Sequence, residues 1–168
     1  MQVQVGILMG SDSDWDKINA VAKALDEFGV QYEVNVMSAH RTPEKVKEYA
    51  ESAMNRGLSV VICAAGGAAH LAGVVAAHTT LPVIGIPVPT ELAGGLDSLL
   101  STVQMPGDIA VATVGANAGG ARNAGILAVQ ILALSDEGLR KKLDDFRKKL
   151  AQKIEEKNAA LKARIAKA

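Results

Sequence analysis

The sequence predicts an α/β protein, a parallel α/β sandwich in which strands and helices alternate along one domain. Short apolar runs alternate with helix-like segments from residue 3 to residue 134. Polar or glycine-rich turns follow the first three apolar runs, as expected where strands of an open sheet end. The chain has 168 residues and 49% hydrophobic content, which is enough for roughly one domain with a sizeable buried core.

Five segments are predicted to form strands, at 3–9, 31–37, 58–64, 82–87 and 109–114. The third is a continuous apolar run, which is typical of a parallel strand buried on both faces. Helices are predicted between and after the strands, at 14–28, 43–56, 68–78, 96–104 and 118–134. Because a helix separates each strand from the next, the strands should run parallel to one another.

The end of the chain is predicted to be a long amphipathic helix. Its apolar residues recur about every one or two helical turns, with charges between them: Leu139, Leu143, Phe146, Leu150, Ile154, Leu161 and Ile165. From Asp136 onward, the sequence contains 11 basic and 6 acidic residues. A nucleic-acid-binding tail is one explanation, but we favour a solvated face or a charge match between subunits. We therefore expect a domain over 1–135 and a helix over 136–168 that docks on a neighbouring subunit.

The composition excludes several classes of protein. The 18 basic and 18 acidic residues cancel, which argues against a nucleic-acid-binding protein that neutralises many phosphates. The single cysteine, Cys63, excludes an intramolecular disulfide and lies in an apolar run, so we expect a buried, inert thiol in a reducing cytoplasm. No apolar run approaches the length of a membrane span, and no leader pattern precedes the first strand. We expect a soluble, unprocessed protein.

The most informative motif is Ser38-Ala39-His40-Arg41-Thr42-Pro43. Thr42 is suited to capping a helix and Pro43 to the first helical position, so His40 and Arg41 should lie just ahead of a helix. They also follow the second predicted strand, at the edge of the sheet where α/β proteins bind ligands. An imidazole beside a guanidinium at this edge is suited to proton transfer next to an anionic group.

A serine- and aspartate-rich loop, Gly10-Ser11-Asp12-Ser13-Asp14-Trp15, follows the first strand. Hydroxyls and free backbone N–H groups suit a phosphate, whereas carboxylates suit ribose hydroxyls. An ordinary helix start with Ser13 as the N-cap would explain part of this pattern, and that alternative remains open. The dinucleotide fingerprint and the P-loop motif are both missing, so ATP, NAD and FAD are not expected and no cofactor is predicted.

A glycine turn with a histidine, Gly66-Gly67-Ala68-Ala69-His70, follows the third strand. Small residues let backbone approach a ligand closely, although a tight turn that packs a helix on a sheet would use them too. His70 shares the predicted edge with His40, which favours a place in the same site. His78 ends the same predicted helix and is better explained by an interaction with the helix C-terminus. Because no cysteine or carboxylate stands at ligand spacing, no metal site is expected.

Four motifs together resemble the class I N5-carboxyaminoimidazole ribonucleotide mutases of bacterial purine synthesis. They lie at 9–15, 38–43, 66–71 and 97–106, and the resemblance covers about residues 1–135. It implies a flavodoxin-like, three-layer α/β/α catalytic domain with a parallel five-stranded sheet, usually assembled as a homo-octamer. It also implies an isomerase of IMP biosynthesis that moves a carboxylate from the exocyclic nitrogen to C4 of an aminoimidazole ribonucleotide, without ATP, biotin or metal.

The resemblance also assigns roles to residues. His40 matches the family's catalytic histidine and His70 a second histidine of the site. The expected substrate-binding residues are Ser11, Ser13, Asp14, Ser38, Arg41, Gly66, Gly67 and Ala68. Arg41 would hold the ribonucleotide phosphate, while His40 would protonate the departing nitrogen and then remove the proton from C4. Ala72 departs from the family pattern, where a proline is expected.

Other functions remain as alternatives. The related class II enzymes carboxylate aminoimidazole ribonucleotide with free CO₂, and a non-catalytic nucleotide- or flavin-binding protein could share the fold. A signalling receiver domain would need an aspartate at the end of the third strand, where Cys63-Ala64-Ala65-Gly66 stands. Flavin carriers stack their ring on aromatic side chains, which make up only 3% of this chain. A serine hydrolase would need a Gly-x-Ser-x-Gly elbow, which the sequence lacks.

Overall fold

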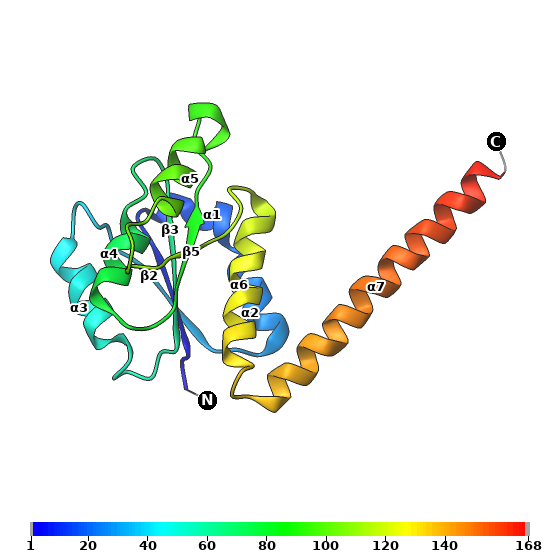
Figure 1. Cartoon of the computed structure of the whole chain (residues 1–168), viewed down its shortest axis with the longest axis horizontal. Coiled ribbons are helices and arrows are strands. Elements are labelled where there is room, and N and C mark those ends of the chain that lie inside the picture. Colours follow the sequence, from blue (N-terminus) through cyan, green and yellow to red (C-terminus); the bar gives the residue numbers. More distant parts are fainter. Residues whose placement is uncertain (1, 167–168) are drawn as a thin grey trace. The chain divides into compact units, whose positions relative to one another are not determined.

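Five parallel strands form one sheet in the order β2-β1-β3-β4-β5. Figure 1 shows this sheet between the helices. The computed structural model describes residues 2–166. The strands are β1 (Val5–Met9), β2 (Tyr32–Val36), β3 (Val60–Ala65), β4 (Val83–Pro87) and β5 (Ala112–Thr113). β1 lies between β2 and β3, and their carboxyl ends are level: Met9 of β1 pairs with Val36 on one side and Ala64 on the other. The predicted parallel α/β fold is confirmed.

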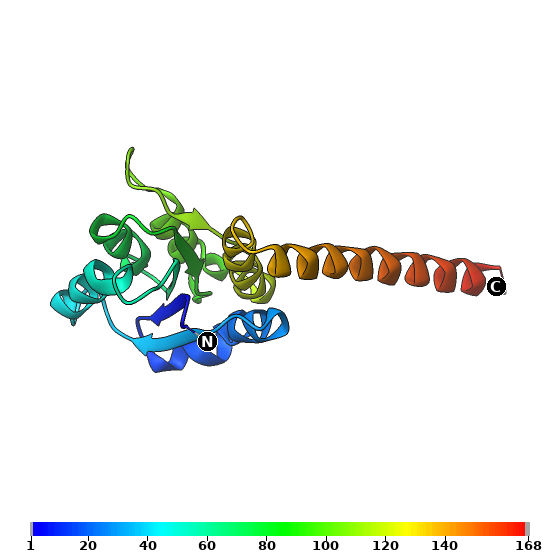
Figure 2. The same cartoon turned by 90° about the horizontal axis from the view of Figure 1, so that it is seen from below.

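Helices cover both faces of the sheet, which gives the predicted three layers. Figures 1 and 2 show α3 and α4 on one face and α1, α2 and α6 on the other. The helices are α1 (Trp15–Ile18), α2 (Ala20–Phe28), α3 (Pro43–Ala53), α4 (Leu71–His78), α5 (Leu96–Val103), α6 (Ala118–Leu132) and α7 (Glu137–Ile165). Two short 3-10 turns, η1 (Asp12–Asp14) and η2 (Leu92–Gly94), precede α1 and α5. α5 shares the face of α4, since Gly85 of β4 faces both Thr102 and Ala72.

Three predicted elements differ from the structure. The helix over 14–28 is interrupted at Asn19, whose side-chain amide bonds to the carbonyl of Asp16 and competes with the helical backbone. The helix over 68–78 begins only at Leu71, because the positive φ of Gly67 (+67°) starts a turn over residues 67–70. The strand over 109–114 shrinks to two residues, because it lies at the edge of the sheet and pairs only with β4, over Ala112 and Thr113.

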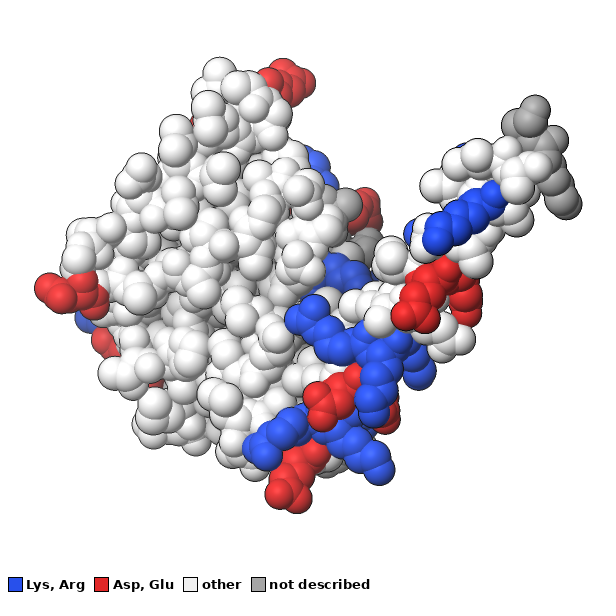
Figure 3. All heavy atoms as spheres, turned by 45° about the vertical axis from the view of Figure 1, so that its right-hand side comes forward, with Lys and Arg blue, Asp and Glu red and all other residues white. Residues whose placement is uncertain are grey.

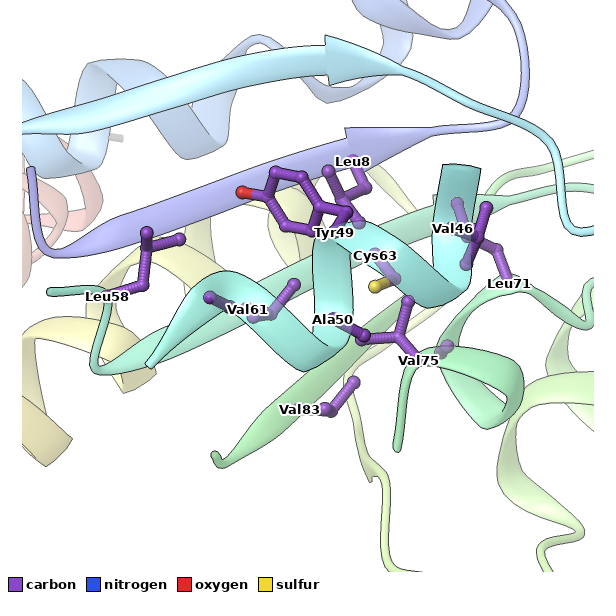
Figure 4. Close-up of a cluster of buried hydrophobic side chains, with 12 residues drawn as sticks. Leu8, Val46, Tyr49, Ala50, Leu58, Val61, Cys63, Leu71, Val75 and Val83 are labelled. Atoms are coloured by element: carbon purple, nitrogen blue, oxygen red, sulfur yellow. The ribbon is translucent and has the colours of Figure 1, made fainter. Parts of the chain in front are cut away.

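A hydrophobic cluster fills the space between the sheet and helices α3 and α4 (Figure 4). Leu8, Val61 and Cys63 reach it from the strands, while Val46 and Val75 reach it from the helices. All five are essentially inaccessible to solvent. The prediction of a buried thiol at Cys63 is confirmed, and this burial raises the pKa of the thiol well above its usual range.

The chain divides into two compact units, one ending at Ile131 and one beginning at Leu132. The second consists mainly of α7, whose N-terminus is capped by the Asp136 carboxylate, which accepts a hydrogen bond from the Leu139 N–H at 2.9 Å. The long C-terminal helix is therefore confirmed, and Figure 3 shows its basic and acidic side chains interspersed. None of the helices within residues 2–166 is both long and apolar enough to cross a membrane.

Candidate functional site

Three loops, which follow the neighbouring strands β1, β2 and β3, enclose a pocket of about 400 Å³ at the carboxyl edge of the sheet. This volume lies within the range of small-molecule sites. Its walls are Gly10, Ser11, Asp14, Ser38, Ala39, His40, Arg41, Ala65, Gly66, Ala68, His70 and Leu71. The structure therefore brings eight of the ten predicted site residues together in one cavity, although they come from segments up to 60 residues apart.

The other two predicted residues, Ser13 and Gly67, do not line the pocket. The Ser13 hydroxyl lies 2.8 Å from the hydroxyl of Ser11, which does line the pocket. Gly67 directs its polar backbone atoms toward α5 instead. Each of the two therefore adjoins a residue of the pocket wall without facing the cavity itself.

The loop after β1 begins with a 3-10 turn, and this changes which serine caps it. Ser11 occupies the N-cap position, and its side chain accepts a bond from the Ser13 N–H, so the alternative with Ser13 as the N-cap is wrong. The reason is that the turn starts at Asp12, two residues before the predicted helix start. Asp14 is partly buried at the pocket wall, and this burial raises the pKa of its carboxyl above the usual value.

The loop after β2 is held by its own side chains. The Ser38 hydroxyl accepts hydrogen bonds from the backbone N–H groups of His40 and Arg41, at 3.3 and 3.2 Å. The Thr42 hydroxyl accepts a bond from the Ser38 N–H at 2.9 Å and donates to the Ser38 carbonyl at 3.1 Å. Thr42 thus closes the loop and makes no capping bond to α3, contrary to its predicted role, while Pro43 does occupy the first turn.

The arginine of this loop ties two loops together. A guanidinium nitrogen of Arg41, Nη2, donates to the carbonyl of Gly10 at 2.9 Å. A guanidinium has five N–H donors, so most of them remain for another partner. Arg41 therefore places a fixed positive charge beside the serines of the loop after β1.

The two histidines contact each other directly. The Nε2 atom of His40 lies 2.8 Å from the Nδ1 atom of His70, and the rings meet edge to face at 77°. A hydrogen bond at this distance requires a proton on one nitrogen and a lone pair on the other. The contact therefore links the tautomer of one ring to that of its neighbour, and it offers a path for a proton between them.

The loop after β3 depends on a helix that is distant in the sequence. The Ser98 hydroxyl accepts a bond from the Gly67 N–H at 2.9 Å, and the Ser101 hydroxyl donates to the Gly67 carbonyl at 3.1 Å. The sequence reasoning gave these serines no role, although their spacing of three residues places them on one helix face. It also missed the walls Gly10, Ala39, Ala65 and Leu71, whose backbone or apolar side chains carry no chemical signature.

The residues outside the pocket have other contacts. His78 ends α4, as expected, and its Nδ1 atom lies 3.7 Å from a carboxylate oxygen of Glu51 on α3. Within residues 2–166, no cluster of three or more histidine, cysteine or acidic side chains could hold a metal ion. The ionisable side chains that line the pocket are the carboxyl of Asp14, the guanidinium of Arg41 and the imidazoles of His40 and His70.

Comparison with known proteins places these motifs in a family. The model for AIR carboxylase matches residues 4–153. The chain is 53% identical over 161 residues to N5-carboxyaminoimidazole ribonucleotide mutase of Bacillus subtilis (strain 168), which covers 96% of this chain and 99% of the relative. The mutase of Mycobacterium leprae (strain TN) is 54% identical over 160 residues, 95% of this chain and 92% of the relative. The crystal structure of Treponema denticola PurE superposes with a TM-score of 0.85 at 31% identity, covering 95% of this chain and 99% of that one. The chain belongs to the AIR carboxylase family.

Proposed function

We propose that this chain is an isomerase that converts N5-carboxyaminoimidazole ribonucleotide to 4-carboxy-5-aminoimidazole ribonucleotide in purine synthesis. The relatives that carry this activity in their names match nearly the whole chain at more than half of the aligned positions. The observation that carries the proposal is the pair His40 and His70 beside Arg41 in one pocket. This arrangement combines an anion-binding group with a proton-transfer group, and the reaction needs both.

The ribonucleotide would lie with its phosphate toward Arg41 and the serine loop. Arg41 keeps free N–H donors after its bond to Gly10, and the Ser11 hydroxyl faces the same cavity. Ser13 would support Ser11 through their short hydroxyl contact. The Asp14 carboxylate, on the same wall, is suited to accept hydrogen bonds from ribose hydroxyls.

His40 would act first as an acid and then as a base. As the N–C bond breaks, a proton from His40 neutralises the exocyclic nitrogen and CO₂ is released. Carbon C4 then attacks the CO₂, which leaves C4 tetrahedral and still bonded to its hydrogen. His40, now neutral, removes that proton and restores the aromatic ring, so the enzyme ends the cycle with the protons it began with. The contact with His70 would orient the ring of His40 for both transfers.

The pocket wall would keep the CO₂ close to C4. Gly66 and Ala68 have little or no side chain, so the substrate ring could approach the backbone of the turn. Ala39, Ala65 and Leu71 make the neighbouring wall apolar. Ser38 would stabilise the loop after β2 through the bonds that its hydroxyl accepts from the N–H groups of His40 and Arg41. A confined, largely apolar space favours recapture of CO₂ over its escape, because the reacting atoms stay in contact.

The enzyme would work in the cytoplasm as a homo-oligomer, of the octameric size that the family resemblance implies. Leu96, Leu100 and Val103 are each nearly half exposed on α5, as an apolar strip that a second copy could cover. The face of the first unit in Figure 3 also carries few charged residues. The apolar residues of α7 would add a further contact between subunits.

An assay with two substrates tests the function. The purified protein is given N5-carboxyaminoimidazole ribonucleotide in one reaction and aminoimidazole ribonucleotide with bicarbonate in another, both without ATP. We expect rapid formation of the C4-carboxylated product from the first and little from the second. Faster product formation from the second would make the chain a carboxylase, and no product from either would remove the proposed activity.

A further inference from the structure

The glycine turn of the site is fastened to α5 at both of its polar backbone atoms. The N–H of Gly67 donates to the Ser98 hydroxyl at 2.9 Å. The Ser101 hydroxyl lies 3.1 Å from the carbonyl of Gly67 and 2.7 Å from the carbonyl of Asp97, so its single proton is shared between the turn and α5 itself. Ser98 is completely inaccessible to solvent. A buried hydroxyl is unfavourable unless it is hydrogen-bonded, so this contact accounts for a polar side chain in the interior.

The same turn carries the groups that face the pocket. The carbonyl of Gly67 also accepts from the Ala69 N–H at 2.9 Å, and the His70 N–H bonds to the carbonyl of Ala68 at 2.9 Å. Gly67 therefore belongs to the hydrogen-bonded turn that leads to His70. His70, at the end of this series, contacts His40.

α5 is a firm support for these contacts. The Thr90 hydroxyl donates to the Asp97 carboxylate at 2.6 Å and thereby ties the segment before α5 to its first turn. This bond, and one from the backbone N–H of Ser98, hold the pKa of the Asp97 carboxyl below its usual value. The Thr102 hydroxyl donates to the Ser98 carbonyl at 2.7 Å, one turn along the helix.

We propose that Ser98 and Ser101 are positioning residues that hold the glycine turn, and through it His70, in the geometry that supports proton transfer at His40. The inference rests on the proposed function, because it takes the two histidines as the proton-transfer groups. Neither serine lines the pocket, so both act through the turn rather than on the substrate.

The first test compares two variants on the same helix. Ser98→Ala removes the acceptor of the Gly67 N–H. Thr102→Val is the matched control, because it removes a buried hydroxyl that bonds only within α5 and keeps the shape of the side chain. We expect kcat to fall about 10- to 100-fold in Ser98→Ala at nearly unchanged KM, and to stay near wild type in Thr102→Val. Equal kcat values for the two variants would overturn the proposal.

A second test asks whether Ser98 acts through His70. In a His70→Asn background, Ser98→Ala should cost less than threefold in kcat, because the group that it positions has already been removed. A full 10- to 100-fold loss in this background would overturn a role through His70. Ser101→Thr keeps a hydroxyl and should retain more activity than Ser101→Ala; the reverse order would also count against the proposal.

Amide hydrogen exchange separates this inference from the proposed function. The Gly67 amide should exchange at least tenfold faster in Ser98→Ala than in Thr102→Val, whether or not the protein turns over the proposed substrate. Protection that is equal in the two variants would show that the serine does not hold the turn. An inactive wild type with the expected exchange pattern would instead leave the serine contact intact and remove the mutase assignment.

Discussion

The loops after β2 and β3 each carry one histidine of the pair, but different parts of the chain hold them in place. Ser38 and Thr42 hold the loop after β2 from within five residues of sequence. Ser98 and Ser101 hold the loop after β3 from a helix more than 30 residues away. The first loop is therefore a local structure, and the second is a tertiary one that exists only once α5 has packed on the sheet.

Substitution of the histidines should have the largest effect. His40→Asn keeps a polar side chain at an exposed position but cannot exchange a proton near neutral pH, so kcat should fall by about 10²- to 10⁴-fold while the nucleotide still binds. Steady-state kinetics and a nucleotide-binding titration check both statements. His70→Asn should reduce kcat less, because His70 acts by orienting the ring of His40. A larger loss in His70→Asn than in His40→Asn would make His70 the proton-transfer group and His40 the residue that orients it.

The difference between the loops explains what the sequence could predict. The motif from Ser38 to Pro43 contains both its chemistry and its supports, so the place of His40 and Arg41 at the strand end could be anticipated. It did not reveal that Thr42 bonds back to Ser38 instead of capping α3, because both arrangements use the same residue. The support of Gly67 by Ser98 was not predictable, since no local pattern joins residues 31 positions apart.

The overall fold was predictable for a similar reason. Apolar runs and intervening helical patterns indicate a parallel sheet, and the predicted ends of the first four strands lie within two residues of the observed ones. The short β5 was overestimated because an apolar pattern does not reveal that this edge strand pairs with one neighbour over only two residues. The docking of the C-terminal helix on another subunit stays a prediction.

Loss of the local support should destabilise the loop after β2. Thr42→Val removes the hydroxyl that bonds to both the N–H and the carbonyl of Ser38 while keeping the side-chain shape. We expect a loss of about 1–2 kcal/mol in the free energy of unfolding, measured by urea denaturation, together with a fall in kcat. Unchanged stability and activity would show that the loop does not depend on its own side chains.

A substitution in the loop after β3 should have a similar or slightly smaller cost. Gly67 has a φ of +67°, and an added Cβ would meet only the Asp97 carboxylate at 3.9 Å. Gly67→Ala should therefore cost about 1–2 kcal/mol through backbone conformation rather than a clash. Gly66→Ala, which lacks the positive φ, is the stability control and should cost less in the same denaturation measurement. An equal cost at both positions would refute this explanation.

The smallest expected effect is a pH dependence of stability that arises from Glu33 in β2. Burial opposes ionisation of Glu33, but hydrogen bonds from Tyr49 and Arg56 outweigh it and hold the pKa of the carboxyl below its usual value. The stabilisation that the ionised Glu33 gives to the folded state should thus be complete above the pKa of this carboxyl in the unfolded chain, about 4.3. It should disappear as the pH falls through the lower pKa of the folded protein. Tyr49→Phe should reduce this acid-side loss in urea denaturation; an unchanged pH profile would contradict it.

The fate of a labelled carboxylate tests the central claim most directly. N5-carboxyaminoimidazole ribonucleotide with ¹³C in its carboxylate is converted by the wild-type protein in the presence of excess unlabelled bicarbonate, and the product is examined by ¹³C NMR. If the two loops confine the released CO₂ beside His40, the C4 carboxylate keeps nearly all of the label. Product that carries the unlabelled carbon of the bicarbonate pool would contradict the account.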